Sequence, residues 1–511
     1  MTLHPRSERL SVAPAHMLAY HGVPGESPTE MEKRPVSTTS LPITSLDGGR
    51  TEVGESILSA LAANLDGSLV RPNDEAYASS VALWNGMITK RPALVVRPGS
   101  VDDVVRTVSF AADHGVQLSI RGGGHNIAGL ALCDGGLTLD MSARNGVEVD
   151  RGARLARVQA GALLGDVDRA TQQHGLAATL GFVSLTGVAG LTLGGGFGYL
   201  TRRFGWTVDD LEEVEIVLAD GSVRRASRTD NADLFWALRG GGGNFGVVTE
   251  FTFRLHEVGP QITGGPIAWP ASEADRVLDA FRRVTESAPR ELTLVAVRRN
   301  APPAPWLPES AHGTPIVMIV ACHSGDPGQA AADLEPITSI GEPLANVIQV
   351  KDYVAQQTML DATQPKGMHY YWKSEFVPGL SDELIATYHR QFEGLTAPAN
   401  QIVLFQMAGA LNEHDEDDGA VGNRDAAFAC VIQSMSAPDS PAAESNKSWV
   451  RNAWQELKPF STGGNYINFQ TDDEPDERTR ESFRSNYDRL RSVKARYDPD
   501  NLFRVNRNIA G

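Results

Sequence analysis

The sequence predicts an α+β fold with one glycine-rich region and one region of antiparallel strands and helices. Strand-like and helix-like segments alternate through the first half of the chain. Three clusters of glycines interrupt that half. Beyond residue 260 the clusters stop, and alternating apolar strands mix with amphipathic helices up to residue 459. The chain is therefore expected to join a glycine-rich domain to a second domain of α+β character.

The first regular unit is predicted to be strand, helix, strand and turn. A short apolar run at residues 94–97 is typical of a strand. Ser100 is a suitable N-cap for a helix at 101–114, where apolar side chains recur at helical spacing. Gly115 is placed to end that helix. The β-branched run at 116–120 predicts a second strand, which leads directly into a glycine turn.

Hairpins and further helices are expected through the rest of the glycine-rich region. The pair Asp220-Gly221 between two apolar runs favours a type I′ turn, in which both central residues have positive φ. Strands are predicted at 136–142, 147–150, 155–160, 214–218 and 247–255, and helices at 163–174 and 232–238.

The second region and the C-terminal segment follow other patterns. Strands are predicted at 316–322, 402–408 and 465–469, and amphipathic helices at 274–287, 381–392 and 479–496. The first 50 residues are rich in Pro, Ser, Thr and charge, without periodicity. The expected domains are a flexible arm (1–50), a glycine-rich domain in two parts (51–260 and 460–511) and a substrate domain (261–459).

The composition excludes several classes of function. The net charge of -17, from 46 basic and 63 acidic residues, argues against nucleic acid as a partner. Cys133, Cys322 and Cys430 have no CxxC spacing, so we expect no disulfide framework, no zinc site and no other metal. No apolar run is long enough to span a membrane, and the N-terminus lacks the apolar core of a secretory signal. We therefore expect a cytoplasmic protein with no membrane partner.

The turn Arg121-Gly122-Gly123-Gly124-His125-Asn126 is the most informative motif. Consecutive glycines let the backbone approach a ligand closely, and their N–H groups can form a concavity that binds anions. With two more glycine clusters downstream, a pyrophosphate is the ligand that fits best. The chain lacks both a GxGxxG turn in a compact βαβ unit and a GxxxxGK[ST] loop. We therefore expect a dinucleotide site of another kind.

Five motifs together carry a resemblance to a known family. They are Arg121 to Asn126, Leu193 to Gly198, Arg239 to Val248, Tyr466 to Asn468 and Tyr497 to Phe503. In this order they resemble the FAD-linked oxidases of the berberine bridge enzyme group, in the vanillyl-alcohol oxidase superfamily. The resemblance implies a two-part PCMH-type FAD-binding domain. It also implies a substrate domain whose antiparallel sheet is covered by helices.

The resemblance further implies how the flavin is held. His125 corresponds to the histidine that bonds covalently to the 8α carbon of FAD. Many members add a cysteine link to flavin C6, but Val183 stands at that position here. We therefore expect FAD with a single covalent bond, through His125. The other implied cofactor-binding residues are Arg121, Gly122, Gly123, Gly124, Asn126, Gly129, Ser184, Thr186, Gly187, Gly190, Gly194, Gly195, Gly196, Gly198, Gly246, Val247, Val248 and Asn468.

Tyr466 matches the family tyrosine near flavin N5 and is the predicted catalytic base, with Tyr371 as a second catalytic candidate. A tyrosine base must lose its proton, so its pKa must fall from about 10 with the help of a positive or hydrogen-bonding neighbour. Packing against the flavin or in the cleft is the alternative for both tyrosines. Tyr370, Lys373 and Gln406 are predicted to line the substrate cleft, where glutamine cannot serve as a base.

The resemblance predicts an FAD-dependent oxidase acting on a small molecule. A hydride would pass from an alcohol carbon or an activated C–H carbon to the flavin, and O2 would take the electrons to give H2O2. A secondary metabolite or a sugar is the expected substrate, and Thr186 falls where the family controls the access of oxygen. Two alternatives stay open, namely a dehydrogenase with another acceptor and a flavoprotein without redox activity. A monomer or a homodimer is expected.

Overall fold

The computed structural model describes residues 39–393, 395 and 397–509. The predicted arm at residues 1–38 lies outside the described residues. Residues 40–50 were expected to belong to that arm, but β1 (Ser40–Thr44) pairs antiparallel with β2 (Arg50–Gly54). This hairpin forms because Ile43 and Val53 are fully buried in the hydrophobic core. Regular structure therefore begins ahead of the predicted boundary.

The first sheet has four strands, in the spatial order β3 (Ser68–Val70), β4 (Leu94–Arg97), β6 (Leu137–Asp140) and β5 (Leu118–Arg121). The predicted unit is confirmed: α3 (Val101–Asp113) lies between β4 and β5, and Ser100 Oγ accepts a hydrogen bond from the Asp103 N–H at 3.2 Å. Because β4 and β5 both run parallel to β6, their carboxyl ends meet at one edge. The glycine turn after β5 starts at that edge.

The second sheet has five strands, in the spatial order β11 (Val223–Ser227), β10 (Leu211–Val217), β12 (Val247–Arg254), β8 (Leu155–Gln159) and β7 (Val147–Asp150). The hairpin predicted around Asp220-Gly221 is confirmed, and the strands predicted at 147–150 and 155–160 pair as a second hairpin. The turn type differs from the prediction, because only Gly221 has positive φ (+75°) and its N–H donates to the Leu218 carbonyl at 2.9 Å. This is the three-residue loop closed by a left-handed glycine.

Short helices connect the strands of the first 260 residues. They are α1 (Glu55–Ala63), α2 (Tyr77–Val81), α4 (Leu164–Gln172), α5 (Val188–Leu193), α6 (Thr201–Phe204) and α7 (Ala232–Leu238). A separate two-stranded ladder pairs β9 (Leu176–Ala177) with β13 (His256–Glu257). The predicted helices at 163–174 and 232–238 are thus confirmed.

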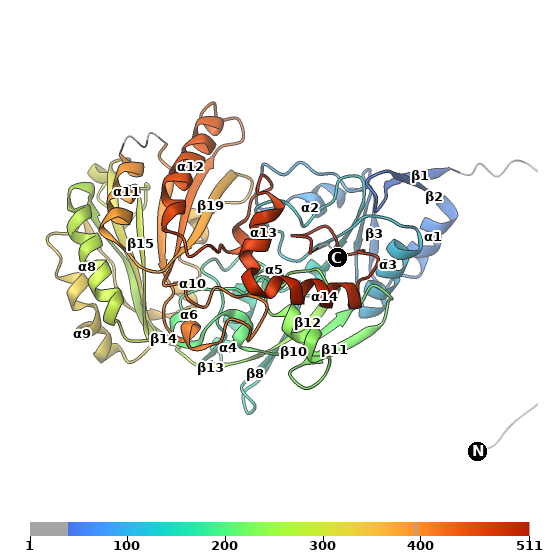
Figure 1. Ribbon diagram of the computed structural model, residues 1–511, viewed down its shortest axis with the longest axis horizontal. Helices are drawn as coiled ribbons and strands as arrows, with labels where there is room; N and C mark the ends of the chain where they lie inside the picture. Colours follow the sequence, from blue (N-terminus) through green and yellow to red (C-terminus); the bar gives the residue numbers. More distant parts are fainter. Residues whose placement is uncertain (1–38, 394, 396, 510–511) are drawn as a thin grey trace, which may run out of the picture. The chain divides into compact units, whose positions relative to one another are not determined.

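The third sheet is antiparallel and has eight strands. Seven lie in the order β17 (Ala345–Asn346), β14 (Gln261–Pro270), β16 (Pro315–His323), β15 (Leu292–Asn300), β20 (Gln401–Gln406), β21 (Phe428–Ser436) and β19 (His369–Val377), while β18 (Gln349–Asp352) also pairs with β14. Helices α8 (Ala274–Ser287), α9 (Pro327–Thr338), α11 (Asp382–Phe392) and α12 (Ala443–Leu457) cover one face (Figure 1). The helix-covered antiparallel sheet is therefore as predicted. The short α10 (Tyr353–Gln357) contacts α4.

Side chains of the third sheet alternate between its two faces. On β15, Leu294 and Ala296 pack in the cluster formed with the covering helices. Val295 and Val297 belong to a different cluster on the opposite face, which looks toward the glycine-rich region. This period of two decides which residues of the sheet can reach a ligand held by the glycine turns.

Two predictions for the C-terminal segment are wrong. The expected strand at 465–469 is a 3-10 turn at Ile467–Phe469. This turn brings Tyr466 and Phe469 into one aromatic cluster, with ring centroids 4.8 Å apart, because side chains three residues apart share a face in such a turn. The expected helix at 479–496 is two helices, α13 (Asp476–Phe483) and α14 (Tyr487–Tyr497), which are separated at Arg484 with a φ of +46°.

Helix α14 returns the chain to the glycine-rich region. The Lys494 ammonium donates to the Asn244 carbonyl at 2.7 Å and to the Asp498 carboxylate at 2.6 Å. The Ile509 N–H donates to the Asn244 side chain at 3.0 Å. The boundaries at residues 260 and 460 stay a prediction, because a single compact unit from Ser40 onward holds both regions. Among the described residues, no helix is both long and apolar enough to cross a bilayer.

Candidate active site

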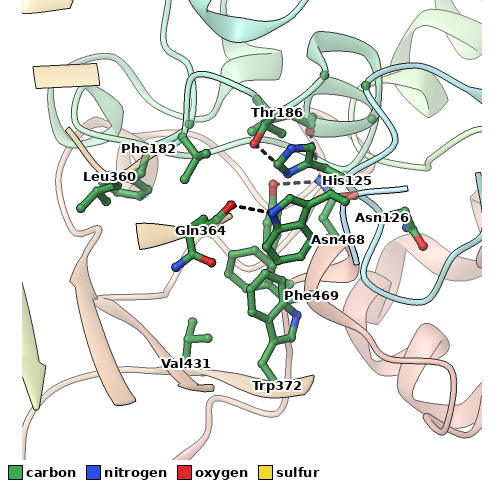
Figure 2. Close-up of a pocket in the computed structure, with 18 of the residues that line it drawn as sticks. His125, Asn126, Phe182, Thr186, Leu360, Gln364, Trp372, Val431, Asn468 and Phe469 are labelled. Carbon is green, nitrogen blue, oxygen red and sulfur yellow. Dashed lines mark hydrogen bonds between the residues drawn. The ribbon is translucent and has the colours of Figure 1, made fainter. Parts of the chain in front are cut away.

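A cavity of about 1140 Å³ is lined by all three glycine clusters and by the free face of the third sheet. The structure brings most of the predicted site residues to its wall. These are Gly122, Gly123, Gly124, His125, Asn126, Thr186, Gly187, Gly190, Gly194, Gly246, Val247, Val248, Tyr466 and Asn468. Figure 2 shows His125 and Thr186 on one side of this space and Trp372 and Phe469 on another. Segments more than 300 residues apart in sequence thus converge on one site.

The glycine positions fit a bound dinucleotide. The turns at Gly123 and Gly187 touch backbone to backbone, since a Cβ on Gly123 would lie 2.5 Å from the Gly187 nitrogen. At Gly190 and Gly243 an added Cβ would meet no protein atom within 4 Å, and both residues line the cavity. A side chain at either position would therefore project into the space that a ligand would fill. The cavity is also large enough for FAD together with a small molecule.

His125 is held at the end of the first glycine turn. Its ring stacks on Trp84 with centroids 5.1 Å apart, and Nδ1 lies 3.5 Å from the Thr186 hydroxyl oxygen (Figure 2). Burial, together with the Lys366 ammonium, lowers the pKa of His125 to about 4. The imidazole is therefore neutral at physiological pH. A neutral ring has a free nitrogen lone pair, which nucleophilic attack on an electrophilic carbon requires.

No thiol lies at the cavity. Val183 is part of the lining, at the position where the resemblance would place a cysteine. Cys133, Cys322 and Cys430 are all buried elsewhere, and none of them lines the cavity. These are the three cysteines of the chain.

Tyr466 is buried at the cavity wall and accepts two hydrogen bonds. The Gly196 N–H donates to its hydroxyl oxygen at 3.1 Å, and the Asn468 amide donates at 2.9 Å. The ring stacks on Trp206 and meets Phe197 edge-on. Burial raises the pKa of Tyr466, although both donors oppose that rise. The predicted fall in pKa is therefore not found, while the hydrogen-bonding neighbours that the prediction required are present.

Several predicted cofactor residues support the turns from outside the cavity lining. The Arg121 guanidinium donates to the carbonyl groups of Ser80 and Ala82 and so anchors the turn to α2. The Ser184 hydroxyl donates to the Asp361 carboxylate at 2.5 Å. The others of this group are Gly129, Gly195, Gly196 and Gly198, where an added Cβ would lie within 2.6 Å of neighbouring protein atoms.

The predicted substrate residues do not line the cavity. Tyr371 and Lys373 of β19 and Gln406 of β20 lie on the helix-covered face of the sheet, because of the period of two. Gln406 instead accepts a hydrogen bond from the Leu294 N–H at 3.1 Å. Tyr370 is on the other face, but Trp84 covers its ring with centroids 3.8 Å apart. The structure therefore gives no support to a catalytic role for Tyr371 or to substrate contacts by Lys373, Gln406 and Tyr370.

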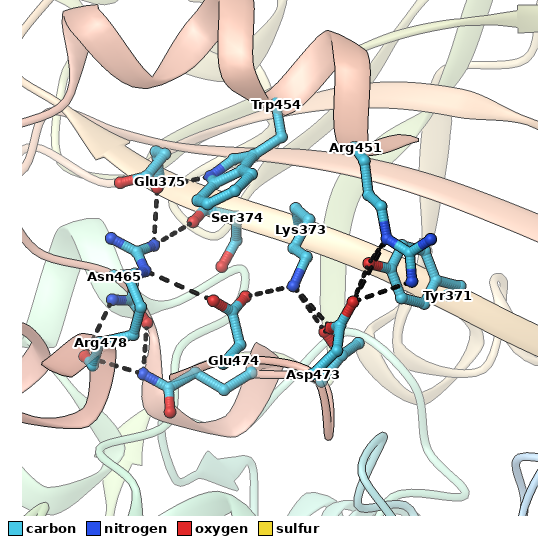
Figure 3. A network of polar contacts seen from close by, with 12 residues as sticks. Tyr371, Lys373, Ser374, Glu375, Arg451, Trp454, Asn465, Asp473, Glu474 and Arg478 are labelled. Carbon is cyan, nitrogen blue, oxygen red and sulfur yellow. Dashed lines mark hydrogen bonds and ion pairs between the residues drawn. The ribbon is translucent and has the colours of Figure 1, made fainter. Parts of the chain in front are cut away.

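Lys373 instead centres a buried ionic network, which we name the β19 clamp (Figure 3). It comprises Lys373, Glu375, Asp473, Glu474 and Arg478. The Lys373 ammonium lies 2.8 Å from a carboxylate oxygen of both Asp473 and Glu474. Arg478 pairs with Glu375 at 2.6 Å and lies 3.5 Å from Glu474. The clamp holds the segment that follows Tyr466 against β19.

The cavity also contains residues that the sequence did not single out. Trp372, Gln433, Gln401 and Arg299 come from four neighbouring strands of the third sheet and all line the cavity. Strict alternation along each strand is the sequence signal that could have found them. It assigns Trp372 to the face opposite Tyr371 and Lys373.

Known protein families match two separate parts of the chain. The family model described as FAD binding domain matches residues 92–227, and the model described as berberine and berberine like matches residues 465–510. An FAD-linked oxidoreductase of Dictyostelium discoideum is 29% identical over 458 residues, which cover 89% of this chain and 96% of that protein.

Solved structures share the fold over nearly their whole length. The 6-hydroxy-D-nicotine oxidase of Arthrobacter nicotinovorans superposes with a TM-score of 0.78 at 26% identity, covering 87% of this chain and 98% of its own. The glucooligosaccharide oxidase of Acremonium strictum superposes with a TM-score of 0.78 at 27% identity, covering 88% and 98%. The latter structure is described with a 6-S-cysteinyl, 8α-N1-histidyl FAD.

Proposed function

We propose that this chain, an FAD-linked oxidoreductase similar to the berberine bridge enzyme group, oxidises a hydroxylated small molecule with O2 as the electron acceptor. The observation that carries this proposal is the convergence of three glycine clusters, a neutral His125 and a doubly hydrogen-bonded Tyr466 on one cavity. Bound FAD would supply the redox chemistry, by accepting a hydride and passing electrons to oxygen. The protein contributes position, electrostatics and the transfer of one proton.

His125 is proposed as the only covalent tether of the flavin. Its neutral imidazole faces the cavity, and no thiol does. His125→Ala should therefore leave FAD that separates from the protein on acid precipitation, whereas the wild-type flavin should stay with the pellet. Flavin that remains covalent in this variant would refute the assignment.

Val183→Cys provides a matched gain-of-function test. Val183 lines the cavity on the loop that ends at Thr186 and Gly187. If position 183 lies where relatives form a second covalent bond from a cysteine to the flavin, the double variant His125→Ala, Val183→Cys should regain acid-stable flavin. Val183→Ala in the same background should not, because it offers no nucleophile.

Tyr466 is proposed to take the hydroxyl proton as the hydride leaves the substrate. Two N–H donors already point at its oxygen, and they would stabilise the phenolate. In the neutral state the phenolic proton has no acceptor among the described residues, so it is free to bond to a substrate oxygen in the cavity. Only the phenolate can act as the base, so Tyr466 must first release its own proton to solvent; its oxygen then accepts the hydroxyl proton of the substrate as the hydride leaves.

The decisive test of the function is anaerobic reduction of the flavin. A panel of sugars, aromatic alcohols and polyketides is mixed with the holoprotein without oxygen, and loss of the flavin absorbance identifies a substrate. Air is then admitted in a stopped-flow instrument. Fast reoxidation supports the oxidase, while slow reoxidation would establish a dehydrogenase that uses another acceptor. No bleaching with any panel member would favour a flavoprotein without redox activity.

A further inference from the structure

Four side chains form a continuous row across the free face of the third sheet. Trp372 of β19 lies opposite Gln433 of β21, Gln433 lies opposite Gln401 of β20, and Gln401 lies opposite Arg299 of β15. Directly opposed residues share one face, and all four line the cavity. The row therefore runs along the cavity floor from one strand to the next.

Hydrogen bonds link the polar members of this row. Arg299 Nη1 donates to Gln401 Oε1 at 3.2 Å, and Gln401 Nε2 donates to Gln433 Oε1 at 2.9 Å. Gln433 Nε2 then donates to Gln364 Oε1 at 3.2 Å. Each side-chain carbonyl accepts one of these bonds, which fixes the donor-to-acceptor direction along the row of hydrogen bonds. Arg299 is its first donor and its only cation.

Arg299 has no carboxylate partner. Its Nε donates to the Asn300 carbonyl at 3.1 Å, and within residues 39–393, 395 and 397–509 no carboxylate lies within ion-pair distance of the guanidinium. The more deeply buried Arg478 and Arg424 pair with Glu375 and Asp209, whereas Arg298 bonds to His389 and Arg202 to backbone carbonyl groups. Because guanidinium cannot lose its proton in a protein, Arg299 places an uncompensated positive charge at the cavity wall.

The rest of the cavity around the row is mainly apolar. Phe182 and Phe405 lie in contact, with ring centroids 4.7 Å apart, and both line the space. Val297, Met318 and Trp306 add further apolar surface. His312 is a further polar group of the lining, and its buried Nε2 has no hydrogen-bond partner among the described residues. Such a wall suits an aromatic or aliphatic body better than a sugar, whose hydroxyl groups would each need a partner.

One end of the row lies next to Tyr466, and the other end lies far from it. Trp372 is 5.2 Å from the ring of Phe469, which in turn contacts Tyr466, so this end lies at the proposed proton-transfer site. Arg299 lies three strands away, and neighbouring strands are about 4.8 Å apart, so the separation is on the order of 14 Å. A ligand that touches both ends must be elongated.

We propose that Arg299 determines substrate specificity by binding a carboxylate, carried at the far end of an elongated apolar substrate whose reacting carbon lies at Tyr466. Arg299 can present a planar fork of N–H donors to the two carboxylate oxygens. The amides of the row hold that fork in place. This inference rests on the proposed function, because it assigns the substrate class of the same cavity.

Binding without turnover tests the inference separately from the oxidase activity. Biphenyl-4-carboxylate and biphenyl-4-carboxamide are titrated by calorimetry into the flavin-loaded protein, with benzoate and benzamide as a shorter pair. The carboxylate should bind at least about 10-fold more tightly than its amide in the longer pair, since a charge-assisted bidentate pair is lost in the amide. Equal affinity, preference for the amide, or no binding of either biphenyl would overturn the proposal.

Variants then locate the preference. Arg299→Gln should abolish the preference for the carboxylate, and Arg299→Lys should retain part of it because the charge remains. Arg154→Gln is the matched control, since Arg154 is exposed and pairs with Glu257 at 2.6 Å. A carboxylate preference that survives in Arg299→Gln would refute the assignment. If that variant does not fold, Arg299→Lys and the wild-type comparison still decide, and neither depends on whether the flavin is ever reduced.

Discussion

Replacing Lys373 with Met should loosen the segment that carries Tyr466, without touching the cavity. The Lys373 ammonium is bonded to Thr471, Asp473 and Glu474 at 2.8 to 2.9 Å, and only 4% of its side chain is exposed. Methionine keeps the apolar stem but leaves Glu474, whose side chain is 3% exposed, with Arg478 at 3.5 Å as its remaining cation.

The magnitude follows from this burial. Removing one partner of a buried ion pair costs about 3–5 kcal/mol, because the other charge stays behind without compensation. If the loss is confined to opening of the clamp, amide hydrogen exchange across residues 466–478 should accelerate at least about 100-fold, since 1.4 kcal/mol corresponds to a factor of ten. Adding Glu474→Gln to Lys373→Met should recover much of the protection, because it removes the stranded charge.

Exchange measured by mass spectrometry on the flavin-loaded protein is the assay, and Lys447→Met is the matched control. Lys447 lies 3.7 Å from Glu444, whose side chain is 73% exposed, and such surface pairs contribute less than about 1 kcal/mol. Unchanged exchange at 466–478 in Lys373→Met, together with weaker substrate binding, would refute the clamp. That result would restore Lys373 to the substrate cleft.

Three further predictions concern ionisation. Tyr466→Phe should slow anaerobic flavin reduction by about 10²-fold or more, measured by stopped flow with an identified substrate. In the wild type that rate should rise with pH across the neutral range, because burial raises the pKa of Tyr466 and the phenolate is the minor form, whereas in Tyr466→Phe it should stay flat. Asn468→Leu should slow the reduction at each pH, since it removes one donor to the phenolate. Burial raises the pKa of Asp168 from 3.8 to about 7, so the folded state keeps a proton that the unfolded state loses, and stability should fall as the pH rises from 4 to 7. Asp168→Asn should remove that loss, on the order of 4 kcal/mol, in thermal unfolding at pH 8 compared with pH 4.

Local signals in the sequence were sufficient for much of this fold. The cap at Ser100, the helix that follows and the glycine after it are fixed by interactions within a few residues, and the structure reproduces them. The glycine turns were equally readable, because close backbone approach between Gly123 and Gly187 admits no side chain. The order of the five motifs together then predicted the domain architecture, which no single turn predicts.

The wrong predictions share a physical cause. Contacts between residues far apart in the sequence determine these features, so a local sequence pattern does not contain them. The segment at 465–469 has the composition of a strand, but no strand in the described part of the chain pairs with it, and its aromatic side chains pack together in a turn. Tyr371 and Lys373 were expected at the cleft without a predicted strand to set the direction of their side chains, and both lie on the helix-covered face of β19. A shift of one residue moves every side chain to the other face of the sheet, and in the structure the pairing with β21 and the packing of α12 fix which face each residue takes.

The position of Lys373 on the helix-covered face of the sheet bears on how Tyr466 is held in place. Tyr466 comes from a turn, not from a sheet, so its backbone has no ladder of hydrogen bonds to fix the phenol. Two contacts replace that ladder: the donors from Gly196 and Asn468 hold the hydroxyl oxygen, and the β19 clamp holds the chain that follows. The Gly196 donor comes from the second glycine cluster, and Lys373 of the clamp comes from the helix-covered face of the third sheet. The proposed base is therefore positioned only when both regions are folded, and a change in the β19 clamp, whose residues do not line the cavity, should reduce proton transfer before it reduces flavin binding.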